Sequence, residues 1–165
     1  MSPTNAEILE ALDKTDYKIL HKLQANSQIS YEELGKSVNL AESTVRYRVK
    51  KLEEQGIIHS YMTVLDAKKL GFDLFIFSEL DVEAGKEQLV AQKLQKFKNV
   101  IGLFSVSGPP DMIAIILARD NGELAEIVRK IRAIQEVHKM ICIFALKAHK
   151  LDLAIKIPLT AKKNE

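Results

Sequence analysis

The segment of residues 30–56 constrains the fold most, because it predicts two helices joined by a very short turn. Ser30 followed by Glu33 is a capping-box pattern, which marks the start of the first helix. Asn39 is typical of the turn that follows, since asparagine tolerates the left-handed backbone conformation. The second helix runs up to Gly56, a residue type that commonly stops a helix. A turn of about three residues between two helices is the spacing of a helix-turn-helix.

A further helix precedes this pair. It runs from about Asp13 to Ala25, with Asp13 as its N-cap and Asp16 adding negative charge to the first turn. Its apolar residues repeat at helical spacing, at Leu12, Ile19, Leu20 and Leu23. We therefore expect residues 1–60 to form a helical domain built around the helix-turn-helix.

The second helix of the pair, from about residue 42 to residue 55, is predicted to have one apolar and one polar face. On a helical wheel Val45, Val49 and Leu52 fall together and should pack inward. The outward and flanking side chains combine hydroxyls, an aromatic ring and cations: Ser43, Thr44, Arg46, Tyr47, Lys50 and Lys51, with Arg48 nearer the core edge. Arginine pairs bidentately with guanine, while Ser, Thr and Lys bind phosphates or base edges. These residues are candidate contacts to double-stranded DNA; the alternative is a solvated helix face, paired in part with Glu53 and Glu54.

The composition changes after Gly56. Residues 57–65 are rich in β-branched, aromatic and bulky apolar side chains, which predicts one or two short strands, the wing of a winged helix-turn-helix. Residues 67–71 indicate a hinge or short turn. We expect residues 61–71 to link the first domain to a second domain over residues 72–165.

The second domain is predicted to contain a strand–helix–strand pattern twice. The expected strands are residues 72–82, 100–107, 112–118 and 137–148, with helices at 86–97 and 121–134 and an added edge strand at 153–157. The order βαββαβ is that of a ferredoxin-like fold, so the whole chain is assigned to the α+β class.

The first predicted strand of this domain is apolar on both faces. Leu74, Ile76 and Leu80 point one way, and Phe75 and Phe77 point the other. Two helices can cover only one face of the sheet, so the other would be a large exposed apolar patch. We therefore predict that a second copy of the chain covers it, which makes the protein an obligate dimer. We also expect these dimers to associate into higher assemblies.

With these features the chain resembles the leucine-responsive and asparagine regulators, the Lrp/AsnC or feast/famine family of transcription regulators. The resemblance rests on residues 12–16 (LDKTD), 19–20, 33–35 (ELG), 43–45 (STV), 46–58 (RYRVKKLEEQGII) and the G-x-x-D turn at 108–111. It covers about residues 10–157. Two departures are Ala41, where the family places Ser or Thr before the third helix, and Asn39, where it places Gly. The resemblance implies a DNA-binding regulator whose second domain binds a small effector, often an amino acid, between dimers.

Effector contacts are carried over from the resemblance by position. Gly108 and Asp111 would frame the pocket, and His138 would be a further side-chain contact. Backbone N–H groups around a glycine turn can hold a carboxylate, and Asp111 can hold an ammonium group. The alternative is that Gly-Pro-Pro-Asp is an ordinary tight turn and that Asp111 accepts hydrogen bonds from local backbone N–H groups.

Composition limits the remaining possibilities. The net charge of +2 means that DNA contacts must come from local arrangement rather than from bulk charge. One cysteine, no apolar run of bilayer length and no basic-then-apolar leader favour a cytoplasmic protein without a membrane partner. Scattered histidines and the lack of a phosphate-binding glycine loop predict neither a metal site nor a cofactor.

Two other functions stay open beside the effector-modulated, sequence-specific regulator. One is an architectural DNA-binding protein that responds to no effector and differs only in its sequence preference. The other is an enzyme similar to the sirohaem decarboxylases, which resemble this family in both domains. The basic reading helix argues against an enzyme, because catalysis has no use for such a surface.

Overall fold

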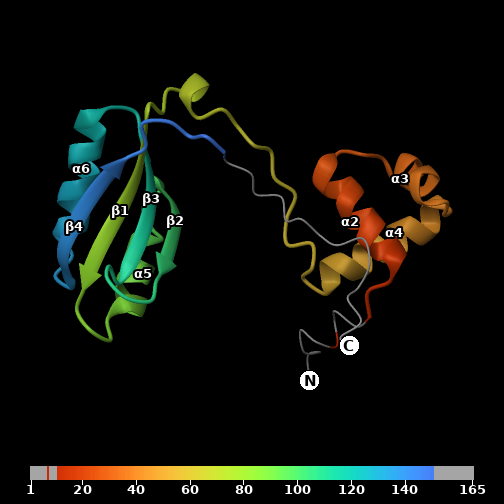
Figure 1. Ribbon diagram of the computed structural model, residues 1–165, viewed down its shortest axis with the longest axis horizontal. Helices are drawn as coiled ribbons and strands as arrows, with labels where there is room; N and C mark the ends of the chain where they lie inside the picture. Colours follow the sequence, from red (N-terminus) through yellow and green to blue (C-terminus); the bar gives the residue numbers. More distant parts are fainter. Residues whose placement is uncertain (1–6, 8–10, 151–165) are drawn as a thin grey trace. The chain divides into compact units, whose positions relative to one another are not determined.

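The computed structural model describes residue 7 and residues 11–150, and these divide into two compact units with the boundary between Val64 and Leu65 (Figure 1). Each unit is considered by itself. The edge strand predicted at residues 153–157 lies outside the described residues.

Over residues 11–64 the first unit contains the helices α2 (Lys14–Ala25), α3 (Tyr31–Val38) and α4 (Glu42–Glu54). Asp13 caps α2 as predicted, and the reciprocal bond from Asp13 N–H to Asp16 makes this a full capping box. Ser30 caps α3 through one half of the expected box, accepting from Glu33 N–H at 3.1 Å. Ala41 gives α4 no side-chain cap, so that helix is positioned by packing.

Apolar side chains from all three helices make the core of this unit. The most deeply buried are Ile19, Leu34, Val45, Val49 and Leu52, each at most 2% exposed. Burying an aliphatic side chain of this size stabilises a fold by about 1.5–3 kcal/mol. The predicted inward stripe of α4 is therefore confirmed, and it fixes which side of the helix faces outward.

The turn between α3 and α4 depends on two residues that permit a close approach. Asn39 adopts the left-handed conformation, with φ 58° and ψ 46°, as predicted. Gly35 lies against the turn: its carbonyl accepts from Leu40 N–H at 3.0 Å, and a Cβ on Gly35 would lie 2.7 Å from the Leu40 carbonyl oxygen. Only glycine lets the backbone of α3 come this near to the turn.

The wing predicted over residues 57–65 is wrong for this structure, since residues 57–66 form no strand. The N–H groups of Ile57 and Ile58 both donate to the Leu52 carbonyl, at 2.9 and 3.1 Å, and so cap the end of α4. Their side chains pack against the helical core. These N–H groups are therefore committed to the helix end and cannot pair with a strand.

The second unit contains a short 3₁₀ turn, η1 (Lys68–Leu70), and a four-stranded sheet with two helices (Figure 1). In chain order the elements are β1 (Leu74–Val82), α5 (Glu87–Leu94), β2 (Val100–Ser105), β3 (Met112–Ala118), α6 (Asn121–Arg132) and β4 (Val137–Phe144). The sheet order is β2-β3-β1-β4 and every neighbouring pair is antiparallel. The βαββαβ order and the α+β class are confirmed.

Three strands are shorter than predicted, since β1 begins two residues later than expected and β2 and β4 end earlier. β2 ends at Ser105 because Val106 N–H donates to the Asp111 carbonyl at 3.0 Å and closes the turn into β3. β4 ends at Phe144, which pairs with Ile76 of β1, and beyond it Ala145 N–H still donates to the Phe75 carbonyl at 2.9 Å.

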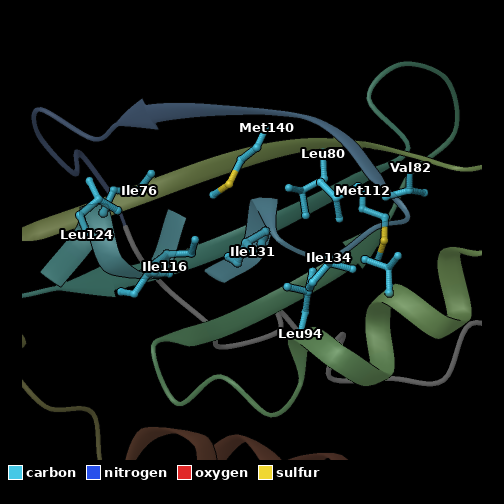
Figure 2. Close-up of a cluster of buried hydrophobic side chains, with 14 of the residues drawn as sticks. Ile76, Leu80, Val82, Leu94, Met112, Ile116, Leu124, Ile131, Ile134 and Met140 are labelled. Atoms are coloured by element: carbon cyan, nitrogen blue, oxygen red, sulfur yellow. The ribbon is translucent and has the colours of Figure 1, made fainter. Parts of the chain in front are cut away.

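Both helices cover one face of the sheet. Figure 2 shows the side chains that meet there. The helices contribute Val90, Leu94, Leu124, Ile127 and Ile131, and the strands contribute Ile76, Leu80, Met112, Ile116 and Met140. These strand positions alternate with outward ones, as the period of two in a strand requires.

Within the described residues, nothing covers the opposite face of the sheet, which carries several exposed apolar side chains. Along β1, Ile76 and Leu80 are fully buried, whereas Phe77 between them is 39% exposed. On β2 and β4, Phe104, Ile141 and Ile143 are also exposed and lie on this outward face. The predicted two-faced apolar strand is therefore confirmed.

Gly35→Ala should destabilise the first unit by about 1–3 kcal/mol, the usual cost of forcing an extra methyl group into a packed site. The added Cβ would displace the Leu40 carbonyl and separate α3 from the turn. Thermal unfolding followed by circular dichroism measures the effect. Lys36→Ala, at the exposed next position, is the control and should change stability by no more than about 0.5 kcal/mol. Equal stability of the two variants would contradict the close approach.

Candidate nucleic-acid interface and effector site

The outward face of α4 is the candidate nucleic-acid interface. Because its buried stripe faces α2 and α3, six of the seven predicted contact residues are exposed: Ser43, Thr44, Arg46, Tyr47, Lys50 and Lys51. Tyr47 is 69% exposed, so its ring contributes little to the core. The face thus presents hydroxyls, an aromatic ring and cations together, on a helix narrow enough to enter a major groove.

Arg46 is held by two neighbours that the sequence did not reveal as part of this face. Its Nη2 donates to Glu42 Oε1 at 2.6 Å, one turn earlier on α4. Its guanidinium also lies over the ring of Tyr31, the first residue of α3, at 4.7 Å from the ring centroid. The Glu42 contact has a recognisable i,i+4 signal, whereas the Tyr31 contact depends on how the two helices pack.

The acidic residues at the end of α4 are only partly engaged with the cations of this face. Lys50 Nζ lies 3.7 Å from Glu54 Oε1, and both side chains are mostly exposed. Glu53 instead accepts a hydrogen bond from the Tyr61 hydroxyl at 2.8 Å. Burial and the Glu53 carboxylate raise the pKa of Tyr61 well above its ordinary value, so the phenol keeps its proton and stays a donor.

Arg48 is separated from the other predicted contacts by its ion pairs. Its Nη1 lies 2.7 Å from Asp13 Oδ2 and 2.8 Å from Asp16 Oδ1, and its side chain is 28% exposed. It therefore joins α4 to the start of α2. Burial raises the pKa of Asp13, but hydrogen bonds from Asp16 N–H and Arg48 outweigh that effect and leave it below its ordinary value.

Gly108 and Asp111 form a turn that is tied to the neighbouring strand. Gly108 has a φ of 84°, and the Pro109–Pro110 bond that follows is cis. Asp111 Oδ2 accepts a hydrogen bond from Val82 N–H at 2.8 Å, where the register of β1 and β4 shifts. The carboxylate thus holds the β2–β3 turn against the end of β1.

Two cavities lie near the predicted effector residues, but neither cavity is lined by all three of these residues. One, of about 180 Å³, is lined by Glu79, Asp81, Pro109, Pro110, Lys139 and Ile141. The other, of about 330 Å³, is lined by Arg132, Val137, His138, Lys139 and Met140. His138 therefore lines a different cavity from the prolines, and neither lining includes Gly108 or Asp111. The first cavity has carboxylates and an ammonium group, with Lys139 Nζ 3.7 Å from Asp81 Oδ2.

Other kinds of site are not evident in the part of the chain that the structure describes. There, no helix is both long and apolar enough to cross a bilayer. In the same residues, no three His, Cys, Asp or Glu side chains gather as metal ligands would.

Comparison with known proteins agrees with this geometry. The family model for the AsnC-type helix-turn-helix domain matches residues 12–53, and the model for the Lrp/AsnC ligand binding domain matches residues 76–155. The chain belongs to the Lrp/AsnC family of transcription regulators, with a DNA-binding helix-turn-helix domain followed by a ligand-binding domain.

Individual relatives match along most of their length. The chain is 34% identical to the HTH-type transcriptional regulator FL11 of Pyrococcus furiosus, over 84% of this chain and 92% of that protein. It is 38% identical to the regulator LrpA of Pyrococcus horikoshii, over 78% and 92%. Among solved structures, the complex of transcriptional regulator NMB0573 from Neisseria meningitidis with L-Met has a TM-score of 0.83 and 27% identity, covering 88% and 96%.

Acid should weaken the first unit through Asp13. Because its folded-state pKa is lowered from 3.8, the stabilisation is present above that value and is lost as the pH falls through the folded pKa. Thermal unfolding between pH 7 and pH 3 should show this decline. Asp13→Asn keeps a capping side chain and removes the titration, so its stability should fall less steeply. Glu32→Gln, in an exposed pair with Lys36, is the control; a slope for Asp13→Asn equal to that of the unchanged protein would contradict the assignment.

Proposed function

We propose that this regulator recognises a particular double-stranded DNA sequence by placing the exposed face of α4 in the major groove. The observation that carries the proposal is the combination of a fully buried stripe with Ser43, Thr44, Arg46, Tyr47, Lys50 and Lys51 on the outward side. The hydroxyls and Arg46 suit base edges, and the two lysines suit phosphates. Varied side chains of this kind favour sequence reading over architectural binding.

Arg48 has a different role in this proposal. Its two carboxylate partners compete with any phosphate. Among the seven predicted contacts, Arg48 is the least exposed. Arg48 therefore supports the interface by fixing α4 on α2, and the remaining cations of α4 make the contacts.

The proposed effector is a small zwitterion such as an amino acid, bound at the cavity beside Pro109 and Pro110. Lys139 there can hold a carboxylate, and Glu79 and Asp81 can hold an ammonium group. Gly108 and Asp111 would shape the turn that closes the cavity, and His138 would act from the neighbouring one. The relative from Neisseria solved with L-Met supports an amino acid as the class to test first.

The proposed assembly is a dimer formed through the uncovered face of the sheet. Exposed Phe77, Phe104, Ile141 and Ile143 would be buried against the same face of a second copy. A dimer would carry two copies of α4, suited to half-sites about one helical turn of DNA apart. A DNA target also fits the cytoplasmic location expected from composition.

A gel-shift titration tests DNA and effector binding together. DNA from upstream of the protein's own gene is the probe, scrambled DNA is the competitor, and a pool of twenty amino acids is added or omitted. Arg46→Ala and Tyr47→Ala should each weaken specific binding by about 1–3 kcal/mol without lowering thermal stability, because both side chains point outward. Arg129→Ala, an exposed arginine on α6 paired with Glu126, is the matched control.

Each outcome of the titration decides a separate part of the proposal. Specific retardation that shifts with the amino-acid pool supports both DNA recognition and amino-acid sensing. Specific retardation that ignores the pool keeps the regulator and removes the amino acid. Equal binding to scrambled DNA favours an architectural protein, and no retardation at moderate salt contradicts DNA recognition itself.

Phe77→Asp should break the dimer, because it places a charge at the centre of the face that two copies would bury. Sedimentation equilibrium should give a mass of at least twice 18.6 kDa for the unchanged protein and a lower mass for the variant. Leu89→Asp, at a similarly exposed apolar position on α5, is the control for a general loss of apolar surface. Circular dichroism checks that both variants fold. A monomeric unchanged protein would refute the assembly.

A further inference from the structure

We propose that Tyr31 and Glu42 are positioning residues that hold the Arg46 guanidinium in place to read a guanine, so that α3 takes part in sequence selection. This inference rests on the proposed function, because it requires that α4 enter the major groove. It assigns roles to two residues that contact Arg46 rather than to further residues that touch DNA.

The two contacts use different parts of the guanidinium. The guanidinium carbon of Arg46 lies over the Tyr31 ring, 4.7 Å from the centroid, and Glu42 accepts from Nη2 at 2.6 Å. A guanidinium carries five N–H donors in one plane. The observed bond to Glu42 uses one nitrogen, and the ring contact is electrostatic, so donors remain for the O6 and N7 acceptors of guanine.

The support itself is fixed in place by the fold. Tyr31 is the first residue of α3, is only partly exposed, and packs against the buried core of the helical unit. Glu42 is the first residue of α4, one turn before Arg46 and on the same side of the helix. The guanidinium is therefore held between two helices whose relation is set by the tight turn at Asn39.

Fixing the Arg46 side chain before DNA binds reduces the conformational entropy that is lost on binding. An unrestrained arginine loses rotamer freedom when it pairs with a base, and that loss weakens binding to the correct site. Arg46 has lost much of that freedom in the unbound protein. Preorganisation favours the one base whose acceptors match the held position, so it increases discrimination more than general affinity for DNA.

Glu42 adds a selective effect of its own. A carboxylate in the groove repels phosphates and base acceptors, and it tolerates the amino group of cytosine. Together, Arg46 and Glu42 fit two adjacent base pairs, with Arg46 on the guanine of a G·C pair and Glu42 on a cytosine amino group. An exposed i,i+4 pair with no such role would contribute only to stability, and then by little.

The test measures discrimination at single bases. The preferred site of the unchanged protein is first selected from random duplexes. Each guanine is then replaced by 7-deazaguanine, which lacks the N7 acceptor, and binding is followed by fluorescence anisotropy. For the unchanged protein one such replacement should weaken binding about tenfold, and Arg46→Lys should abolish that difference. Failure to select any site would refute the proposed function and this inference with it.

The positioning roles are then tested with matched variants. Tyr31→Leu and Glu42→Gln should each reduce the discrimination about threefold. Affinity for random DNA should stay unchanged in Tyr31→Leu and should not fall in Glu42→Gln, which removes a carboxylate that repels phosphates. Thermal stability should stay unchanged in Glu42→Gln, because its ion pair is exposed. Tyr31→Phe keeps a ring under the guanidinium and should keep the discrimination. Glu32→Gln removes an equally short exposed pair on α3 that touches no arginine, and should have no effect.

The contrary results are equally definite. Full discrimination in Tyr31→Leu and Glu42→Gln, together with its loss in Arg46→Lys, would overturn the inference and leave DNA recognition by Arg46 intact. An equal loss of specific and random binding would also overturn it, because that is the effect of damage to the domain. If Tyr31→Leu does not fold, the exposed Glu42→Gln decides the question alone.

Discussion

The burial of one side of α4 is the constraint on which the first unit depends. Val45 and Val49 are fully buried and Leu52 nearly so, which leaves α4 a single rotational setting against α2 and α3. No side chain caps the start of α4, so packing and the close approach at Gly35 fix where this helix begins. The outward face is then a consequence of the core, and its polar residues are held on a rigid element rather than on a loop.

In the second unit, packing differs between the two faces of the sheet. Its alternating strands give one face to α5 and α6 and leave aromatic and aliphatic residues on the other. The cavity beside Pro109 and Pro110 lies at the border of that second face, where Glu79 and Ile141 also project. The proposed dimer face and the proposed effector cavity are therefore neighbours on one sheet, so under these two proposals ligand binding has a physical route to assembly.

Local signals in the sequence predicted much of this fold. Caps, helical periodicity and alternation gave the three helices, the left-handed Asn39 and the βαββαβ order. They failed where a residue's partner is distant or unexpected. The wing was wrong, since residues 57–66 form no strand and the N–H groups of Ile57 and Ile58 donate to Leu52 instead. At the candidate site, the wheel gave the outward residues of α4 but not the ion pairs of Arg48 with Asp13, 35 residues earlier, or the stacking of Arg46 on Tyr31.

The pairing of Arg48 has a consequence for how ionic strength acts on the protein. A cation already neutralised within the fold displaces no counterion from DNA, and Arg46 is similarly matched by Glu42. At the proposed interface, Lys50 and Lys51 are then the cations of α4 best suited to phosphates, so α4 itself would add little to the electrostatic, sequence-independent part of the affinity. Base contacts carry little of this salt dependence. Preference for one sequence over another would thus persist when salt changes, even as total affinity falls.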